Sequence, residues 1–256
     1  MTLNGFATLF IVTCVAIGAV ALTLPSSKPS MPAASTVEDP AAYGQRLVTE
    51  TFALIGPEAP DNAKRFAGNN LTCQNCHLDA GTNRAAVPLA GVYDTYPKFS
   101  SRSGRTISLT ERIDECMTRS MNGRPLPADS REMAAFLAYI HSMRGAPAPD
   151  NPPDPPATRP GDATRGAEVY ARTCAACHQP HGLGKRAGLG YEFPPLWGPD
   201  SFNDSAGMDR FERAVRFIRH NMPRGVDPAN PQLSLQEAWD VAAFLQARPR
   251  PHYEGR

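Results

Sequence analysis

Two short motifs of identical spacing contain the residues most able to do chemistry. In each, two cysteines separated by two residues are followed at once by a histidine: Cys73, Cys76 and His77, and then Cys174, Cys177 and His178. At this spacing both thiols can form thioethers with the vinyl groups of one porphyrin, and the adjacent imidazole can bind its iron. One motif alone could be a surface thiol pair or half of a zinc site. Two complete copies predict a chain with two covalently attached c-type haems.

The cysteine that follows the first motif is the next candidate. Of six cysteines, four lie in the motifs and Cys14 lies in an apolar N-terminal segment, which leaves Cys116 without a disulfide partner. Haem attachment takes place in oxidising compartments, where a lone thiol requires an explanation. Cys116 follows His77 at a distance similar to that at which Met222 follows His178. Both are therefore candidates for the second axial ligand of a haem iron.

Arginines surround Cys116 in the sequence. They are Arg102, Arg105, Arg112, Arg119 and Arg124. Cationic neighbours lower the pKa of a thiol and favour the reactive thiolate, which would also lower the reduction potential of an iron that it ligates. The alternative is a small buried apolar residue, which is common for a free cysteine. The arginines favour the thiolate interpretation.

Met222 is the favoured axial ligand for the second haem. It stands beside Pro223 and Gly225, where a helix is expected to end and the chain can fold over a haem. Its soft thioether would raise the potential, which suits electron transfer. The alternative is that Met222 only ends an apolar helix face. The less favoured candidates are Met208, Lys185 and His220.

Each half of the chain repeats the same order of elements around its motif. Apolar residues at helical spacing predict a helix before each motif, from Tyr43 to Ile55 and from about Thr164. Irregular loops follow the motifs, and further helices close each half. The expected closing helices are 110–121 with Thr110 as N-cap, 130–145, 208–222 and one opened by a capping box at Ser234. The sequence therefore predicts an all-α fold with two cytochrome c-like domains in tandem, joined by a proline-rich linker.

Composition sets the expected boundaries. Residues 6–24 carry no charge and are long enough to cross a bilayer, but small residues at 19 and 21 also fit a secretory cleavage site. Segments rich in Pro, Ser and Ala predict a flexible tether and a stiff linker. The expected segments are 1–24 as signal peptide or membrane anchor, 25–40 as tether, 41–145 as first domain, 146–161 as linker and 162–256 as second domain.

The charge balance limits the partners of the protein. With 26 basic and 25 acidic residues the formal net charge is +1, so no broad basic surface for nucleic acid is expected. The only lysines are Lys28, Lys64, Lys98 and Lys185. The fork of an arginine side chain binds oxyanions with paired hydrogen bonds, although a coding bias toward arginine explains most of the excess equally well.

Several segments resemble the thiosulfate dehydrogenases. They are 73–81 (CQNCHLDAG), 102–104 (RSG), 112–127 (RIDECMTRSMNGRPLP), 193–198 (FPPLWG), 206–208 (AGM), 217–223 (FIRHNMP) and 236–242 (QEAWDVA). The similarity extends over nearly all of the chain from Tyr43 to Pro251. The stretches around Cys116 and Met222 are the most specific to the family.

This resemblance implies a periplasmic dihaem oxidoreductase, soluble or anchored through residues 6–24, that joins two thiosulfate ions into tetrathionate and releases two electrons. It implies that His77 and Cys116 ligate the first haem iron and that Cys116 is catalytic. For the second haem it implies His178 with Met222, because Asn221 stands where some members have lysine. Residues 41–145 would form the catalytic domain, and 162–256 would pass electrons to a soluble or membrane-bound cytochrome or to a quinone-linked acceptor.

The charge of the expected substrate assigns a role to the arginines. Thiosulfate is a dianion, so two of them can meet only where cations offset their repulsion. We therefore expect Arg102, Arg112, Arg119 and Ser120 to bind anions beside Cys116. Two alternatives are an electron-transfer cytochrome with a structural Cys116, and a sulfur-carrier cytochrome that needs a partner subunit. Two haems on one chain favour the self-contained enzyme, and no residue sets the direction, thiosulfate oxidation or tetrathionate reduction.

Overall fold

The described part of the chain begins just before the first expected domain. The structure, a computed structural model, describes residues 38–147, 154, 155 and 157–255. The expected signal peptide or anchor (1–24) lies outside these residues, as do 25–37 of the expected tether and 148–153 and 156 of the expected linker. Within the described ranges, no helix combines the length and the apolar character that a membrane span requires.

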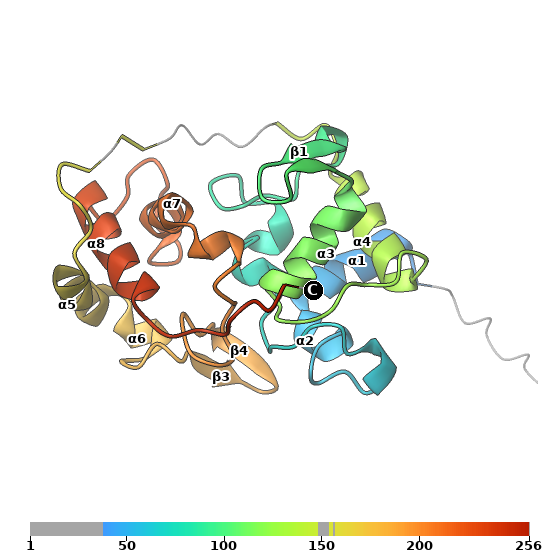
Figure 1. Ribbon diagram of the computed structural model, residues 1–256, viewed down its shortest axis with the longest axis horizontal. Coiled ribbons are helices and arrows are strands. Elements are labelled where there is room, and N and C mark those ends of the chain that lie inside the picture. Colours follow the sequence, from blue (N-terminus) through green and yellow to red (C-terminus); the bar gives the residue numbers. More distant parts are fainter. Residues whose placement is uncertain (1–37, 148–153, 156, 256) are drawn as a thin grey trace, which may run out of the picture. The chain divides into compact units, whose positions relative to one another are not determined.

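The described secondary structure is mainly α-helical (Figure 1). The first half contains α1 (Pro40–Thr49), α2 (Thr51–Leu54), α3 (Leu109–Arg119) and α4 (Arg131–Ser142). The second half contains α5 (Ala163–Thr173), α6 (Ala175–His178), α7 (Phe211–Asn221) and α8 (Leu235–Gln246). Short 3-10 helices are η1 (Asn62–Lys64), η2 (Cys73–Asn75), η3 (Asp79–Gly81), η4 (Tyr93–Thr95) and η5 (Gly207–Asp209). The helical fold class is confirmed.

Two antiparallel hairpins interrupt the loops that were expected to be irregular. In the first half β1 (Lys98–Ser100) pairs with β2 (Arg105–Ile107), with Phe99 opposite Thr106. In the second half β3 (Lys185–Ala187) pairs with β4 (Gly190–Phe193), with a register shift at its start. Each hairpin lies in the loop between the haem motif of its half and the helix that follows.

In both halves the first and last helices cross at a glycine. Helix α1 packs on α4, and α5 packs on α8. A Cβ on Gly44 would lie only 2.1 Å from the Ala135 carbonyl oxygen, and a Cβ on Gly166 would lie 2.0 Å from the Asp240 carbonyl oxygen. Only glycine allows such close approach of two helix backbones. The repeat of this crossing shows that the two halves share one architecture.

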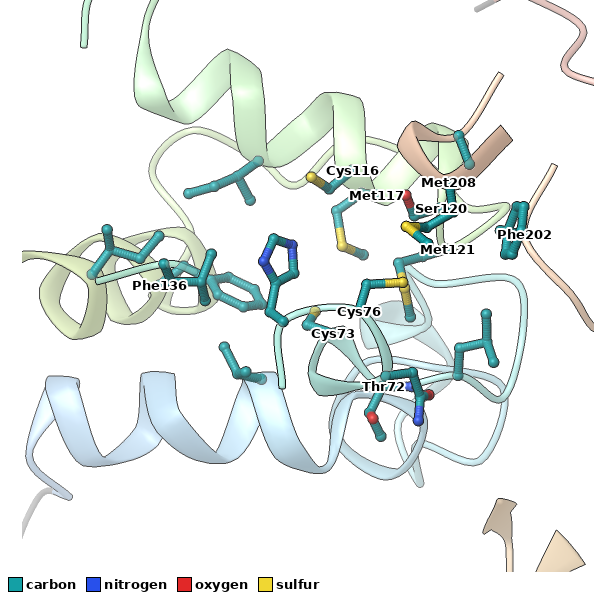
Figure 2. A pocket seen from close by; sticks show the side chains of 18 residues that line it. Thr72, Cys73, Cys76, Cys116, Met117, Ser120, Met121, Phe136, Phe202 and Met208 are labelled. Atoms are coloured by element: carbon teal, nitrogen blue, oxygen red, sulfur yellow. The ribbon is translucent and has the colours of Figure 1, made fainter. Parts of the chain in front are cut away.

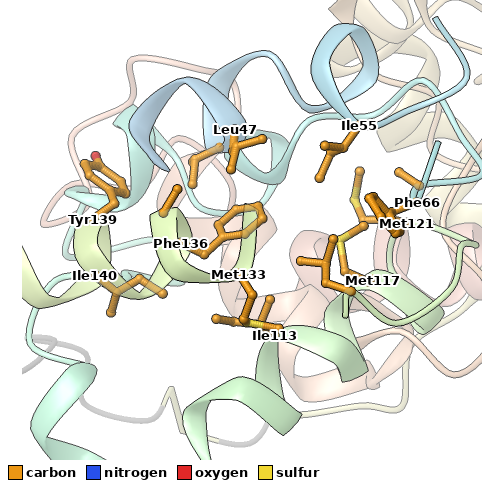
Figure 3. Close-up of a cluster of buried hydrophobic side chains, with 14 of the residues drawn as sticks. Leu47, Ile55, Phe66, Ile113, Met117, Met121, Met133, Phe136, Tyr139 and Ile140 are labelled. Carbon is orange, nitrogen blue, oxygen red and sulfur yellow. The ribbon is translucent and has the colours of Figure 1, made fainter. Parts of the chain in front are cut away.

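The first half has a continuous apolar core between α1, α3 and α4 (Figure 3). Leu47 of α1, Met117 of α3 and Met133 of α4 are fully buried in it. Apolar residues at helical spacing produce this arrangement, because each helix turns one stripe of side chains inward. Met117 and its neighbours thereby fix the rotation of α3, and with it the direction of Cys116 one residue earlier.

The start of α3 differs from the sequence prediction. The expected N-cap at Thr110 is wrong, because Ser108 caps the helix. Ser108 accepts a hydrogen bond from the Glu111 backbone N at 3.1 Å, and the Glu111 carboxylate accepts one from the Ser108 N at 2.7 Å. This capping box requires an acidic residue three positions after the cap, which Ser108 has and Thr110 lacks. The capping box at Ser234 is confirmed.

Hydrogen bonds also join the two halves of the described chain. The Asn122 side chain donates to the Ser201 carbonyl at 2.6 Å, and the Asn221 side chain donates to the Ala85 carbonyl at 3.1 Å. Phe202 of the second half packs against the core of the first. The second half therefore contributes side chains to the surroundings of the first haem motif.

Candidate active site and the second haem pocket

The first haem motif and α3 face each other across a cavity. Cys73, Cys76 and His77 line one side, and Cys116 and Ser120 of α3 line the other. Figure 2 shows Cys116 on α3, across this space from Cys73 and Cys76. The remaining walls are largely apolar. Two thiols, an imidazole and apolar walls around one space fit a covalently attached haem.

Backbone carbonyl groups orient both motif histidines. The Nδ1 of His77 lies against the Val87 carbonyl oxygen, and the Nδ1 of His178 lies 2.8 Å from the Pro194 carbonyl oxygen. A carbonyl oxygen can only accept, so Nδ1 carries the proton and donates in both rings. The lone pair of each Nε2 is thereby left for a metal, which is the arrangement of a haem-ligating histidine.

The Cys116 thiol lies within hydrogen-bonding reach of the His77 ring. Burial raises the pKa of this thiol. Arg112, one helical turn earlier, and the His77 ring lower the pKa by more than burial raises it, so that it lies at about 7. The motif cysteines differ, because burial raises the pKa of Cys73 to about 11 and that of Cys76 to about 12. Among these three thiols, Cys116 is therefore the one suited to act as a thiolate.

Three of the expected anion-binding residues lie close to this thiol in the chain: Arg112 and Arg119 belong to α3, and Ser120 is its C-cap. Arg112 donates to Glu115 at 3.2 Å, Arg119 lies 3.5 Å from the same carboxylate, and Ser120 lines the cavity. The Nε and Nη1 atoms of Arg119 are buried and make no hydrogen bond. One carboxylate thus stands between two guanidinium groups, which leaves an excess of positive charge.

Arg102 adds to this excess from the loop before α3. Burial together with Arg119, Arg210 and Arg112 lowers the pKa of Arg102 to about 10. Repulsion among these guanidinium groups thus adds to the effect of burial.

Two other arginines of the sequence cluster lie elsewhere. Arg105 pairs with Glu111 at 2.6 Å on the surface, and Arg124 stacks on the Phe66 ring and donates to the Ala63 carbonyl at 2.8 Å. No arginine is among the described residues that line the first cavity, and Arg105 and Arg124 are in addition held by partners of their own. Proximity in sequence overstated the cluster, because the side chains of a hairpin and of a loop after a helix need not share the helix face of Cys116.

Sequence reasoning missed two arginines of the second half. Arg213 interacts electrostatically with both Cys116 and Arg112, and Arg210 interacts with Arg102 and Arg213. Arg210 occupies the N-cap of α7 and makes no side-chain cap hydrogen bond. An arginine at the N-cap of a helix is unusual and can be recognised in the sequence. Its proximity to the surroundings of Cys116 can be seen only in the tertiary structure.

The second motif lines a larger, mainly apolar pocket. Cys174, Cys177, His178 and Met222 all line it, and Leu196, Phe217, Val241 and Leu245 are among its apolar walls. Of the other candidate ligands, Lys185 pairs with Glu192 at 2.7 Å, and His220 is held by the Asp154 carboxylate at 3.1 Å. Neither lines the pocket, whereas Met208 and Met222 do.

One wall is common to both pockets. Its residues are Leu71, Asn75, Cys76, Phe202 and Met208. The cysteine belongs to the first motif, whereas the last two residues belong to the second half. Groups held in the two pockets would therefore be separated by single side chains.

Comparisons with known proteins agree with this arrangement. Residues 62–147 match the family model "SoxA/TsdA, cytochrome c domain", and residues 161–245 match "Cytochrome C oxidase, cbb3-type, subunit III". A thiosulfate dehydrogenase of Allochromatium vinosum is 39% identical over 236 residues, which cover 88% of this chain and 85% of the relative. The chain belongs to the thiosulfate dehydrogenase family. It therefore carries two covalently attached haem c groups in two tandem cytochrome c domains.

Two further relatives extend the comparison. A thiosulfate dehydrogenase of Stutzerimonas stutzeri is 39% identical over 82% of this chain and 69% of its own length. The solved structure of thiosulfate dehydrogenase TsdBA from Marichromatium purpuratum aligns with a TM-score of 0.74 and 36% identity over 83% of this chain. The chain spans 46% of that longer protein.

Proposed function

We propose that this member of the thiosulfate dehydrogenase family oxidises two thiosulfate ions to tetrathionate in the first pocket and passes the two electrons through the second pocket to an external acceptor. The observation that carries the proposal is the Cys116 thiol, which lies within hydrogen-bonding reach of His77 and has a pKa of about 7 in surroundings that contain more arginines than carboxylates. Arg224 and Arg250 line the second pocket, but each of them is paired with a carboxylate, and Met222 stands there in place of a thiol like Cys116.

The motif residues divide into attachment and ligation. Thioether bonds would form at Cys73 and Cys76 for the first haem and at Cys174 and Cys177 for the second. His77 with Cys116, and His178 with Met222, would be the axial ligands. A thiolate lowers the potential of its iron and a thioether raises it, so electrons would move from the first haem toward the second. Residues 41–145 then form the catalytic domain, 146–161 the linker and 162–256 the electron-transfer domain.

The first chemical step forms a bond between Cys116 and one thiosulfate. The Cys116 thiolate and the outer sulfur of thiosulfate join in an S–S bond, and two electrons leave this pair of sulfur atoms. The bound haems supply two one-electron acceptors for them. Arg112 lies one turn before Cys116 on α3 and would hold the sulfonate end of this first thiosulfate, with Arg119, Ser120 and Arg102 nearby.

The second step releases the product. The outer sulfur of a second thiosulfate attacks the sulfur atom bound to Cys116. The central S–S bond of tetrathionate forms, the bond to Cys116 breaks, and its electron pair returns to Cys116 as thiolate. This is an exchange of the thiol–disulfide type, in which a leaving thiol of low pKa departs faster. The lowered pKa of Cys116 therefore assists this step.

Charge repulsion is the main obstacle to this reaction. Two unit charges 4 Å apart repel each other by about 4 kcal/mol at an effective dielectric constant near 20, and each thiosulfate carries two charges. Guanidinium groups offset this repulsion with charge-assisted hydrogen bonds. The excess of arginine over carboxylate near Cys116 is suited to that task.

Electrons would leave through the wall that the two pockets share. Phe202 and Met208 of the second half contact both cavities. An external cytochrome, or a quinone-linked acceptor, would then receive the electrons from the second haem. Covalent haem attachment places this reaction in an oxidising compartment, which we propose is the periplasm.

Replacing the proposed nucleophile tests the function. We expect Cys116→Gly to abolish tetrathionate formation from thiosulfate with ferricyanide as acceptor, and to change the absorption spectrum of one haem. Thr118→Ala, which lies on the same helix and bonds only to backbone carbonyl groups, is the matched control and should remain active. Full activity of Cys116→Gly with an unchanged spectrum would refute the proposal.

The same assay separates the two alternative functions. An electron-transfer cytochrome would form no tetrathionate even as the unaltered chain. A sulfur carrier would gain sulfur on Cys116, as measured by intact mass, but would form tetrathionate only with a partner subunit. Tetrathionate formed by the purified chain alone excludes both.

A further inference from the structure

A segment of the second domain forms part of the first cavity. The Asn203 side chain donates to the Thr118 carbonyl at 3.0 Å, and the Asn203 backbone N donates to the Arg119 carbonyl at 3.2 Å. These bonds fasten the segment to the C-terminal end of α3. Met208 then lines the cavity together with Cys116 and Ser120 (Figure 2). The chain therefore enters α7 beside the proposed nucleophile.

Arg210 and Arg213 follow Met208 by two and five residues. The Arg213 Nη1 lies 2.9 Å from the position that a Cβ on Gly207 would occupy, so its guanidinium folds back toward the residue before Met208. Within the described part of the chain, no carboxylate forms a hydrogen bond or an ion pair with Arg102, Arg210 or Arg213. They differ in this from described arginines such as Arg165, which pairs with Asp240, and Arg224, which pairs with Asp79.

The cations around Cys116 repel one another. Burial, Arg112 and Arg210 lower the pKa of Arg213, and the Arg102 pKa is lowered in the same way. In addition, Arg210 and Arg213 lie at the first turn of α7, where the helix dipole disfavours positive charge. The arrangement opposes folding unless anions bind. Glu115 alone, already shared by Arg112 and Arg119, does not neutralise it.

We propose that Arg210 and Arg213, with Arg102, form a second anion subsite that holds the attacking thiosulfate. Arg112 and Arg119 lie on the helix of Cys116, so they serve the thiosulfate that is bonded to it. Arg210 and Arg213 approach the cavity from the other domain, which separates the two dianions. The subsite rests on the proposed function, because it is defined by the second step. That step needs no further oxidant, since the S–S bond formed replaces the one broken.

The subsite implies that the electron-transfer domain completes the active site. The first domain alone would hold the nucleophile and the first thiosulfate but would lack the cations for the second. Loss of this subsite should therefore slow the exchange step and leave the formation of the Cys116 adduct nearly intact.

A double variant tests the subsite in the intact, haem-loaded chain. For Arg210→Gln/Arg213→Gln we expect the half-saturating thiosulfate concentration to rise about 10- to 100-fold, since charge-assisted hydrogen bonds are lost. With limiting thiosulfate and excess ferricyanide, intact mass should show an accumulated thiosulfate adduct on Cys116. Arg210→Lys/Arg213→Lys should recover part of the affinity, because it restores the charge without the fork.

The matched control removes the same charge from one residue of the linker and one residue of the second domain. Arg159 and Arg172 are exposed and lie away from the first cavity. Arg159→Gln/Arg172→Gln should keep the saturation behaviour of the unaltered chain. If Arg210→Gln/Arg213→Gln also keeps it, or if both double variants lose affinity equally, the subsite is refuted while the proposed function stands. If the unaltered chain forms no tetrathionate and no Cys116 adduct, the proposed function itself fails.

Discussion

The two pockets share one construction plan and differ in what faces the motif histidine. Both histidines donate Nδ1–H to a backbone carbonyl, and both pockets lie between a glycine-crossed helix pair and a loop. In the first pocket a thiol projects from within α3, whereas in the second a thioether follows the end of α7. The same haem attachment is thus combined with two different facing residues, which fits the two tasks proposed for the pockets.

The charges around the pockets differ in the same sense. Cations near the second pocket have carboxylate partners: Arg224 with Asp79, Arg250 with Asp209 and Lys185 with Glu192. Arg102, Arg210 and Arg213 near the first pocket have none among the described residues. Paired cations serve the protein itself, whereas unpaired ones attract anions from solution. This contrast supports the proposal that the substrate binds at the first pocket.

Replacing Cys116 by methionine should make the two pockets alike, and we expect it to have the largest effect of the changes considered. In Cys116→Met the first pocket would carry a thioether like that of the second. We expect thiosulfate oxidation to fall by about 1,000-fold or more, because the residue that forms the covalent adduct is lost. The potential of the first haem should rise, since a thioether donates less charge than a thiolate. Redox titration followed by absorption measures this shift alongside turnover.

Cys116→Met also separates ligation from nucleophilic catalysis. The variant keeps a sulfur ligand at the position of Cys116, unlike Cys116→Gly. If Cys116 only ligated the iron, Cys116→Met would retain substantial turnover with a shifted potential. Such a result would end the proposal of a covalent adduct and would make the two pockets chemically equivalent.

Removal of the second thioether should have an intermediate effect. Met222→Ala opens the face of the second pocket opposite His178 and lowers the potential of that haem, which weakens the driving force for electron removal. We expect turnover to fall by about tenfold, with the half-saturating thiosulfate concentration unchanged. Steady-state kinetics and redox titration check both parts. Met208→Ala is the control that distinguishes the two methionines of the pocket, and a larger shift of potential for it would reassign the ligand.

Local sequence patterns predicted much of this architecture. The haem motifs, the capping box at Ser234 and the apolar stripes of α1 and α4 depend on residues within two turns of one another. The N-cap of α3 was placed two residues late, because Thr110 and Ser108 are both suitable caps and only the position of Glu111 decides between them. Patterns of this range require no knowledge of the tertiary fold.

The candidate site was predicted only in part. Cys116 was found because it is the one cysteine of the folded part that is outside a motif, and Arg112 because it lies one turn away on the same helix. Arg210 and Arg213 escaped, since they reach Cys116 through bonds such as that of Asn203 with Thr118, which join distant segments. Arg105 and Arg124 are close to Cys116 in the sequence, but their side chains lie elsewhere. Contacts between domains do not produce a regular spacing of residue types from which they could be predicted.

The last comparison concerns a buried carboxylate at the helix crossing of each domain, and its replacement is expected to have the smallest effect. In the first domain the buried Glu132 accepts hydrogen bonds from Tyr43 at 3.1 Å and Lys64 at 3.2 Å. In the second, the buried Asp240 accepts two from Arg165, both close to 2.9 Å, and these bonds lower its pKa. Asp240→Asn should therefore reduce the free energy of unfolding by about 1–2 kcal/mol at pH 7, a modest value because Arg165 is partly exposed.

The pH dependence of this loss identifies its cause. A depressed carboxyl pKa contributes stability that is present above the pKa of the unfolded chain, about 3.9, and is lost as pH falls through the folded value. The difference between Asp240→Asn and the unaltered chain should hence shrink from pH 5 downward, as measured by chemical denaturation followed by circular dichroism. Glu132→Gln, whose carboxyl pKa is also lowered although burial opposes the shift, should lose less. A pH-independent loss for Asp240→Asn would instead indicate a packing defect at the α5–α8 crossing.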